Sequence, residues 1–121
     1  MTSTLVDTYV RGARKLYEYD CTNVSAAETV RAALNVNHRV AVVGVAVSEG
    51  TAGTLSFLSK PSGAASKTLA LELAIHQGII ERFQLESPYE FLFVTKPGEA
   101  LQISSTITLS DMFLWLIDLE A

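Results

Sequence analysis

The sequence is poor in cysteine, in charge and in long apolar runs, and each shortage excludes a class of protein. Its single cysteine, Cys21, cannot form a disulfide within the chain, which fits a protein made in a reducing compartment. No apolar stretch approaches the roughly 18 residues of a membrane-spanning helix, so we expect no membrane partner. The first 15 residues contain no basic region followed by an apolar run, so we expect no signal peptide.

Charge is scarce and unevenly distributed. Charged residues make up 18% of the 121 residues, and the net charge is −4. Residues 1–39 hold five basic and four acidic side chains, whereas residues 40–121 hold four basic and nine acidic ones. A nucleic-acid backbone requires clustered Lys and Arg, so the acidic body argues against a nucleic-acid partner. The short cluster of Arg11, Arg14 and Lys15 is more typical of a solvated turn than of a phosphate site.

The chain offers no recognisable catalytic or metal-binding constellation. His38 and His76 are its two histidines, and neither has Cys, Asp or Glu at ligand spacing nearby. Cys21 follows acidic residues that would raise its pKa, so we interpret it as a small buried apolar residue. Serine is abundant, but no strand–Ser–helix elbow is present. We therefore expect no enzymatic activity, no cofactor and no metal.

What the sequence has in abundance is the period-two alternation of β-strands. From residue 101 to residue 109 the odd positions are mainly Leu and Ile, and the even positions are Gln, Ser and Thr. Residues 91–94 precede this stretch across a Lys-Pro-Gly turn, and residues 112–117 follow it, which predicts a three-stranded meander. Residues 40–47 (VAVVGVAV) are apolar on both faces, which predicts a central strand with both sides covered.

Further short strands are predicted at residues 16–21, 54–59, 69–76 and 79–85. Residues 25–34 are ambiguous, because Ser25 and Glu28 match a helix capping box while Asn35 and Asn37 suit a hairpin turn. We favour the strand. About eight or nine short strands with frequent turn signals indicate an all-β fold, an antiparallel β-sandwich of jelly-roll type. Trp115 is expected to pack in its core rather than to serve as a ligand platform.

Residues 1–23 are interpreted as an N-terminal arm with a possible first strand, and residues 24–121 as the β-sandwich domain. Gly12 interrupts any helix in the first 15 residues, so a flexible or partner-ordered segment is expected there. Its apolar side chains have no obvious place in the sandwich, and its basic ones are available to acidic groups of a partner. The predicted partner-binding residues are Leu5, Tyr9, Val10, Arg11, Arg14, Lys15 and Tyr17.

Residues 29–121 also carry a rhythm of strands and turns that resembles a known group. The stretches concerned are RVAVVGVAVS at 39–48, GTLSF at 53–57, GII at 78–80, PYEF at 88–91 and GEALQISS at 98–105. They resemble small β-sandwich virion proteins of tailed bacteriophages, namely capsid decoration (cement) and head-fibre proteins. The resemblance implies a non-enzymatic protein made in the host cytoplasm that binds the major capsid protein on the outside of the phage head. It also implies a homo-oligomer, expected to be a homotrimer.

Two rival functions remain open at this point. A fibre or receptor-recognition module of the same fold would bind surface carbohydrate or protein, and would need exposed loop aromatics, of which only Tyr89 qualifies. A jelly-roll enzyme or ligand carrier would need polar residues facing into the sandwich. The strands at residues 40–47 and 113–117 are apolar on both sides, which argues against that third function.

Overall fold

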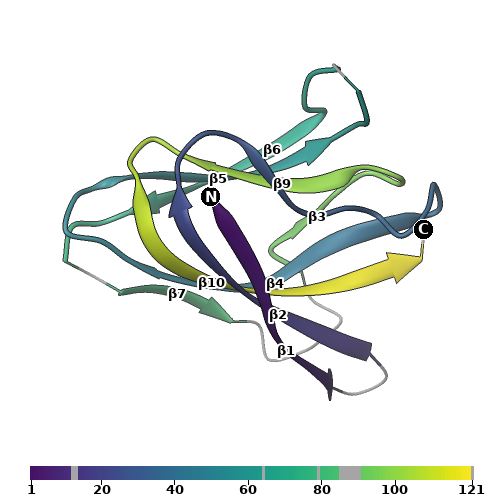
Figure 1. The fold of residues 1–121 in the computed structure, drawn as a ribbon, viewed down its shortest axis with the longest axis horizontal. Helices are drawn as coiled ribbons and strands as arrows, with labels where there is room; N and C mark the ends of the chain where they lie inside the picture. The colour runs from purple at the N-terminus through teal and green to yellow at the C-terminus, as the bar shows by residue number, and fades with distance from the viewer. Residues whose placement is uncertain (12–13, 64, 79, 85–90, 121) are drawn as a thin grey trace.

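The chain folds into two antiparallel β-sheets that pack face to face, and the described residues contain no helix (Figure 1). The computed structural model describes residues 1–11, 14–63, 65–78, 80–84 and 91–120. Its strands are β1 (Thr2–Arg11), β2 (Arg14–Val24), β3 (Glu28–Arg31), β4 (His38–Ser48), β5 (Gly53–Lys60), β6 (Leu69–Ile75), β7 (Ile80–Gln84), β8 (Phe93–Val94), β9 (Ala100–Ser105) and β10 (Leu109–Glu120).

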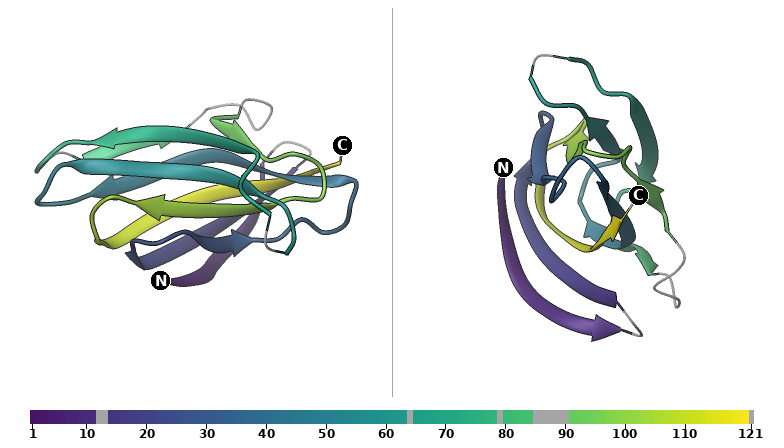
Figure 2. Two further views of the ribbon diagram at one scale, coloured as in Figure 1. Left: turned by 90° about the horizontal axis from the view of Figure 1, so that it is seen from above. Right: turned by 90° about the vertical axis from the view of Figure 1, so that its right-hand side faces the viewer.

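The strand order is that of a jelly roll with one extra strand. The large sheet has the order β1-β2-β10-β4-β7, and the small sheet has the order β3-β9-β5-β6. β7 pairs with residues 44–48 of β4 and β8 pairs with residues 41–42, so together they act as one interrupted edge strand. Without β1, each sheet then has four strands, and the chain crosses repeatedly from one sheet to the other (Figure 2). β1 is the addition, and it pairs with β2 as a hairpin.

The main core lies between the two sheets and is built from alternate residues of their strands. Leu55 and Phe57 of β5 and Leu114 and Leu116 of β10 all belong to this core, and all four are fully buried. The rings of Phe57 and Phe93 stack with their centroids 6.2 Å apart. Because side chains alternate between faces, the residues between these core positions of β10 point to the outer face of the large sheet.

That outer face carries a second buried cluster. It is formed by Leu16, Ala41, Val43, Trp115 and Ile117, with Phe91, Val94 and Leu119 packed against it. The large sheet is therefore apolar on both faces, which explains why β4 and the second half of β10 read as continuous apolar runs. Trp115 is buried as predicted, but in this second cluster rather than in the space between the sheets.

The sequence predicted the fold class correctly. The structure is an all-β antiparallel sandwich, the ambiguous residues 25–34 contain the strand β3, and β4 is central and buried on both faces. The predicted Lys-Pro-Gly turn joins β8 to β9. Gly98 has a φ of 78° there, and a Cβ on it would lie 3.2 Å from Cα of Val36. This turn therefore requires glycine for both its conformation and its space.

Three predictions about the arrangement of strands are wrong. The C-terminal strands do not form a meander, because β8 and β10 lie in the large sheet and β9 lies in the small one. The strand predicted for residues 101–109 ends at Ser105, and Leu109 already begins β10. The segment expected to be a flexible or partner-ordered arm is a regular strand, β1. The turn predicted at residues 86–88 lies outside the described residues.

Candidate functional site

The outer edge of β1 is the most distinctive surface feature of the molecule. Among the described residues, β1 pairs only with β2, over a register that runs from Thr2 opposite Thr22 to Arg11 opposite Arg14. Its other edge therefore presents a row of backbone N–H and C=O groups to the surroundings. Such an edge is a template for pairing with another chain.

Proteins usually protect long edge strands with charged side chains, especially Lys, with Pro, with β-bulges or by keeping the strand short. β1 has ten residues, TSTLVDTYVR, without Lys or Pro. Three of its apolar side chains, Leu5, Val6 and Val10, are exposed. Its one irregularity leaves Val6 out of register between Leu5 and Asp7, and the strand continues on both sides. β1 is thus a long edge whose protection along its length consists of one bulge and the charge of Asp7.

A second weakly protected edge is β6 in the small sheet. Among the described residues β6 pairs only with β5, and its sequence LALELAI also lacks Lys and Pro. Leu69 is exposed at its beginning. β1 (purple) and β6 (teal) lie on opposite sides of the molecule in Figure 1 and in the right-hand view of Figure 2. The molecule therefore offers two different edges that face away from each other.

The structure places the predicted partner-binding residues on the β1–β2 hairpin. Leu5, Tyr9, Val10 and Arg11 belong to β1, and Arg14, Lys15 and Tyr17 belong to β2. Arg11 and Arg14 are the last pair in register before the hairpin turn, and Lys15 beside them is exposed. Tyr17 differs from the rest, because its ring lies 3.9 Å from the guanidinium carbon of Arg31 and packs against the main core. Tyr17 thus makes its contacts within the chain. A role for the set in binding a partner stays a prediction.

A pair of carboxylates on the outer face of the large sheet escaped the sequence analysis. Asp20 lies opposite Phe113, and Asp111 lies opposite Thr22, so the two carboxylates are diagonal neighbours on β2 and β10. Hydrogen bonding to Asp111, burial and the charge of Asp111 raise the pKa of Asp20 above its usual value. Oδ1 of Asp20 is buried and has no hydrogen-bond partner among the described residues. The sequence shows an acidic residue on each of two predicted strands. Their proximity cannot be inferred until the register of the two strands is known.

Cys21 is fully buried in the main core, as predicted. Burial raises the pKa of its thiol to about 12, and the charges of Asp20 and Asp111 act in the same direction. The reactive form of cysteine is the thiolate, so this thiol is both inaccessible and unreactive at neutral pH.

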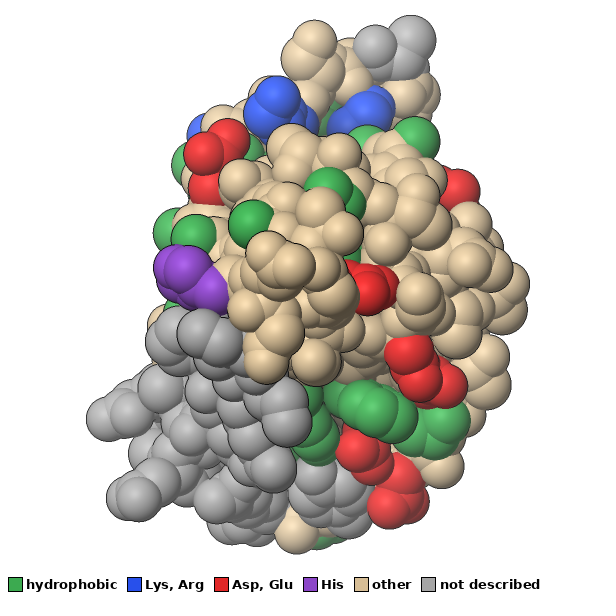
Figure 3. All heavy atoms as spheres, turned by 90° about the vertical axis from the view of Figure 1, so that its left-hand side faces the viewer, with side chains coloured by type: hydrophobic (Ala, Val, Ile, Leu, Met, Phe, Trp, Pro, Cys, Tyr) green, Lys and Arg blue, Asp and Glu red, His purple; other side chains and the backbone are tan. Residues whose placement is uncertain are grey.

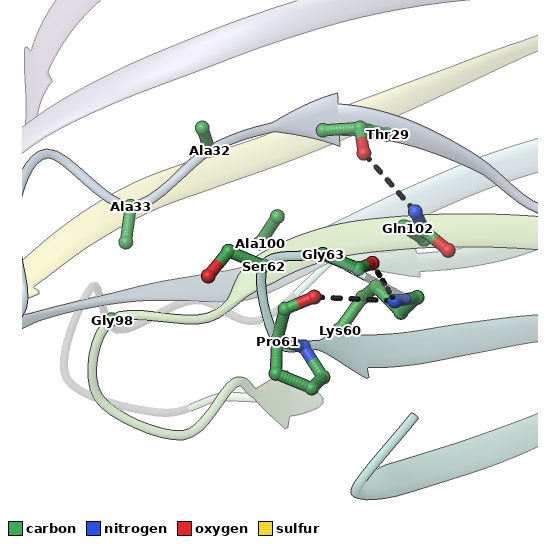
Figure 4. Close-up of a pocket in the computed structure, with 10 residues that line it drawn as sticks. All are labelled: Thr29, Ala32, Ala33, Lys60, Pro61, Ser62, Gly63, Gly98, Ala100 and Gln102. Atoms are coloured by element: carbon green, nitrogen blue, oxygen red, sulfur yellow. Dashed lines mark hydrogen bonds between the residues drawn. The ribbon is translucent and has the colours of Figure 1, made fainter. Parts of the chain in front are cut away.

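A hollow of about 330 Å³ lies on the outside of the small sheet, between the ends of β3, β5 and the start of β9 (Figure 4). Small side chains such as Ala32, Ala33 and Ala100 line much of it. Nζ of Lys60 donates to the carbonyl oxygens of Pro61 at 3.2 Å and Gly63 at 3.0 Å. Nζ of Lys60 is therefore engaged within the chain, and the described lining identifies no ligand.

Other kinds of site have little support in the described residues. No group of three or more His, Cys, Asp or Glu side chains is arranged to hold a metal ion there. The same residues include no helix long and apolar enough to span a membrane.

No family model matches the chain, and no curated protein shows significant sequence similarity to it. Among solved structures, the chain is similar in fold to a protein of Bacillus endospore appendages, which are described as a novel family of disulfide-linked pili. The match has a TM-score of 0.52 at 12% sequence identity, and covers 97% of this chain and 98% of the other. At this level of identity the likeness establishes a shared fold.

This likeness corrects the predicted identity. The resemblance to phage decoration and head-fibre proteins is wrong, because the whole-chain match is to a pilus protein of bacterial spores. Four further predictions rested on this resemblance and are rejected with it. They are the function as a capsid decoration protein, the homotrimer, the location on the capsid exterior and synthesis in a phage host. The major capsid protein is likewise unsupported as a partner. The spacing of strands and turns that suggested a phage protein is a property of the jelly-roll fold, which proteins of unrelated function share.

Proposed function

We propose that this chain is a non-enzymatic structural subunit that associates with copies of itself into a fibre. The carrying observation is the β1 edge, which is long, bears three exposed apolar side chains and has neither Lys nor Pro to discourage strand pairing. A full-length likeness in fold to a protein of the disulfide-linked pili of Bacillus endospores supports the proposal. It also favours the fibre alternative of the sequence analysis over a capsid protein.

The two weakly protected edges determine the kind of assembly. If β1 pairs with β1 of another copy, the contact is symmetric and closes into a dimer. If β1 pairs with a different edge, every assembly of such copies keeps one free edge of each kind, and it grows into a fibre unless the contacts close into a ring. β6 is the best second edge, because it has seven residues and lies on the opposite side from β1. We therefore propose that β1 of one subunit extends the small sheet of the next.

Disulfide links are not part of the proposed assembly. The described relative forms disulfide-linked pili. The present 121 residues contain only Cys21, so each copy can form at most one disulfide, which joins two copies and no more. Cys21 is moreover buried in the core with a raised pKa. Backbone hydrogen bonds and apolar contacts must therefore hold this fibre together.

The test is to add charge to the edge of β1. The variant carries Val6→Lys and Val10→Lys, at positions whose side chains are 50% and 69% exposed. The matched control carries Leu34→Lys and Val36→Lys, at loop positions that are 62% and 77% exposed. Light scattering and electron microscopy would follow assembly of all proteins at equal concentration. We expect the β1 variant to remain monomeric and the control to assemble like the unmodified protein.

If the β1 variant and the control both failed to assemble, exposed apolar residues in general, and not the β1 edge, would be responsible for assembly. An unmodified protein that stays monomeric up to high concentration would overturn the proposed function altogether.

A further inference from the structure

The outer face of the large sheet is acidic next to β1. Leu16 of β2 belongs to the buried cluster on this face, so the alternate residues Glu18 and Asp20 point to the same side. Asp7 of β1 lies opposite Glu18, and Asp111 of β10 is a diagonal neighbour of Asp20. Asp7, Glu18, Asp20 and Asp111 form what we call the acidic group. The residues directly opposite them across β1, β2 and β10 include no Lys or Arg.

Exposed lysines lie beside the start of β6, at the other edge of the molecule. Lys67 comes two residues before Leu69, the first residue of β6. The backbone nitrogen of Lys96 donates to Oγ of Ser59 at 3.0 Å, and Ser59 of β5 lies opposite Leu69. Glu99 accepts from the same Oγ at 2.8 Å, so this end holds two exposed basic side chains beside one engaged carboxylate. Neither Lys67 nor Lys96 belongs to an ion pair among the residues that the structure describes.

Charges of opposite sign are thus separated on the surface of the molecule. On the face shown in Figure 3, the visible Lys and Arg side chains gather at the top, whereas several Asp and Glu side chains lie toward the lower right. Separated charge of this kind favours contacts between unlike surfaces of two copies and disfavours contacts between like surfaces.

The acidic group disfavours the symmetric pairing of two β1 strands. In an antiparallel register that overlaps the two strands fully, the two Asp7 residues are diagonal neighbours. Because neighbouring strands are about 4.8 Å apart and successive residues about 3.4 Å, their backbones would lie about 6 Å from each other. That separation is within the Debye length of about 8 Å at physiological salt. Both acidic groups would also share one face of the joined sheet, so the closed dimer accumulates repulsion.

Pairing with β6 brings Asp7 to the lysines instead. Glu72 in the middle of β6 is exposed and would repel Asp7, so the favourable place for Asp7 is the start of β6, beside Lys67. In an antiparallel arrangement this place overlaps residues 2–7 of β1 with most of β6. A parallel arrangement would overlap only residues 7–11 of β1. The antiparallel arrangement therefore gives the longer ladder of backbone hydrogen bonds.

We infer that Asp7 and Lys67 determine which edge β1 selects, with Asp7 of one copy beside Lys67 of the next and β1 antiparallel to β6. This inference rests on the proposed function, and adds to it the direction and register of the strand pair. Complementary charge acts on the choice of partner more than on affinity. Its main effect here is to exclude the closed β1–β1 dimer, which would end growth.

The test is a charge exchange between these two residues. Asp7→Lys and Lys67→Glu are made singly and together, and association is measured by sedimentation at low and physiological salt. We expect each single reversal to weaken association about fivefold, because an attraction becomes a repulsion, and the double variant to restore most of it. These differences should shrink as salt is added. The matched control is Glu120→Lys, an equal change of charge at an exposed position of β10, which should not restore association of the Lys67→Glu protein.

A second variant separates charge from local structure at Asp7. Oδ1 of Asp7 accepts a hydrogen bond from the backbone nitrogen of Thr8 at 2.8 Å, and Asp7→Asn keeps an acceptor there while removing the charge. It should weaken association about twofold. Thermal melting should show that all variants stay folded, since Asp7 and Lys67 are both exposed.

The outcomes distinguish this inference from the proposed function. A lysine on an edge strand can by itself hinder pairing. If Lys67→Glu fails to restore association of the Asp7→Lys protein, that hindrance is the cause and the inference is wrong. Single reversals without effect on a protein that associates would also overturn the inference, while self-association stands. If the unmodified protein never associates, the proposed function itself has failed.

Discussion

Arg31 and Asp118 connect the two sheets through a bidentate ion pair. Nε of Arg31 donates to Oδ1 of Asp118 at 2.8 Å, and Nη2 donates to Oδ2 at 2.6 Å. The remaining nitrogen of the guanidinium donates to the hydroxyl of Tyr19 at 2.7 Å. Hydrogen bonding to Asp118 raises the pKa of Arg31 further above its usual value. Because β3 belongs to the small sheet and β10 to the large one, a single side chain holds the short edge strand against the other sheet.

We expect Arg31→Ala to lower the free energy of unfolding by about 3 kcal/mol, because it leaves the carboxylate of Asp118 mostly buried without its partner. Replacing both residues, as Arg31→Met with Asp118→Leu, should cost much less, since no unpaired charge remains. Arg31→Lys keeps the charge but loses the bidentate geometry, and should lie between the two. Urea denaturation of the four proteins measures these differences. Equal losses for Arg31→Ala and the double replacement would show that the pair contributes through packing alone.

The two neighbouring aromatic residues on the outer face of β10 should respond oppositely to truncation. Trp115 is 7% exposed within the second buried cluster, and Trp115→Ala should destabilise the fold by about 3–5 kcal/mol. Phe113 is 38% exposed, and Phe113→Ala should change stability by less than about 1 kcal/mol. Thermal and chemical unfolding of both variants tests this. A stable Trp115→Ala protein would mean that the outer cluster is not a packed core.

The sequence predicted the all-β sandwich, because the alternation of apolar and polar residues and the turn residues that identify strands are local features of the chain. It did not predict which strands pair, since β9 and β10 follow each other in the chain but lie in different sheets. Arg31 and Asp118 are 87 residues apart, and Asp20 meets Asp111 only through the register of β2 and β10. Such pairs depend on topology, which no local pattern encodes. β1 was misread because its alternation is weak and its polar residues suit a solvated segment as well as an edge strand.

The raised pKa of Asp20 predicts a particular dependence on pH. In the folded protein Asp20 keeps its proton to a higher pH than in the unfolded chain, so this group stabilises the fold at acid pH. That contribution is lost as the pH rises above the unfolded value of about 3.9 and through the raised pKa of the folded state. Asp20→Asn should therefore be more stable than the unmodified protein at pH 7, and the difference should shrink toward pH 3. Glu72→Gln serves as the control for the loss of one exposed acidic charge. A difference that does not change with pH would contradict the coupling to Asp111.

The thiol of Cys21 should be unreactive in the native protein. Its thiol is fully buried and its pKa is raised to about 12, so an aromatic disulfide reagent at pH 8 should react only as the protein unfolds. Fibres of this chain should also survive a reducing agent, and Cys21→Ala should assemble like the unmodified protein. Rapid labelling under native conditions, or fibres that dissolve on reduction, would show that the thiol is available and that covalent links contribute.

The division of the chain at residues 23 and 24 stays a prediction, and two truncations test it. Among the residues whose burial is described, no fully buried core residue lies in β1, whereas β2 supplies Leu16, Cys21 and Val24. Removing residues 1–11 should therefore leave a cooperative jelly roll whose melting temperature falls by less than about 5 °C, corresponding to about 1 kcal/mol. Removing residues 1–23 takes away the strand between β1 and β10, and we expect that protein to unfold. Circular dichroism and thermal melting distinguish the two results. If the shorter protein remains cooperatively folded, β2 belongs with β1 to a separable arm and the jelly roll closes without it.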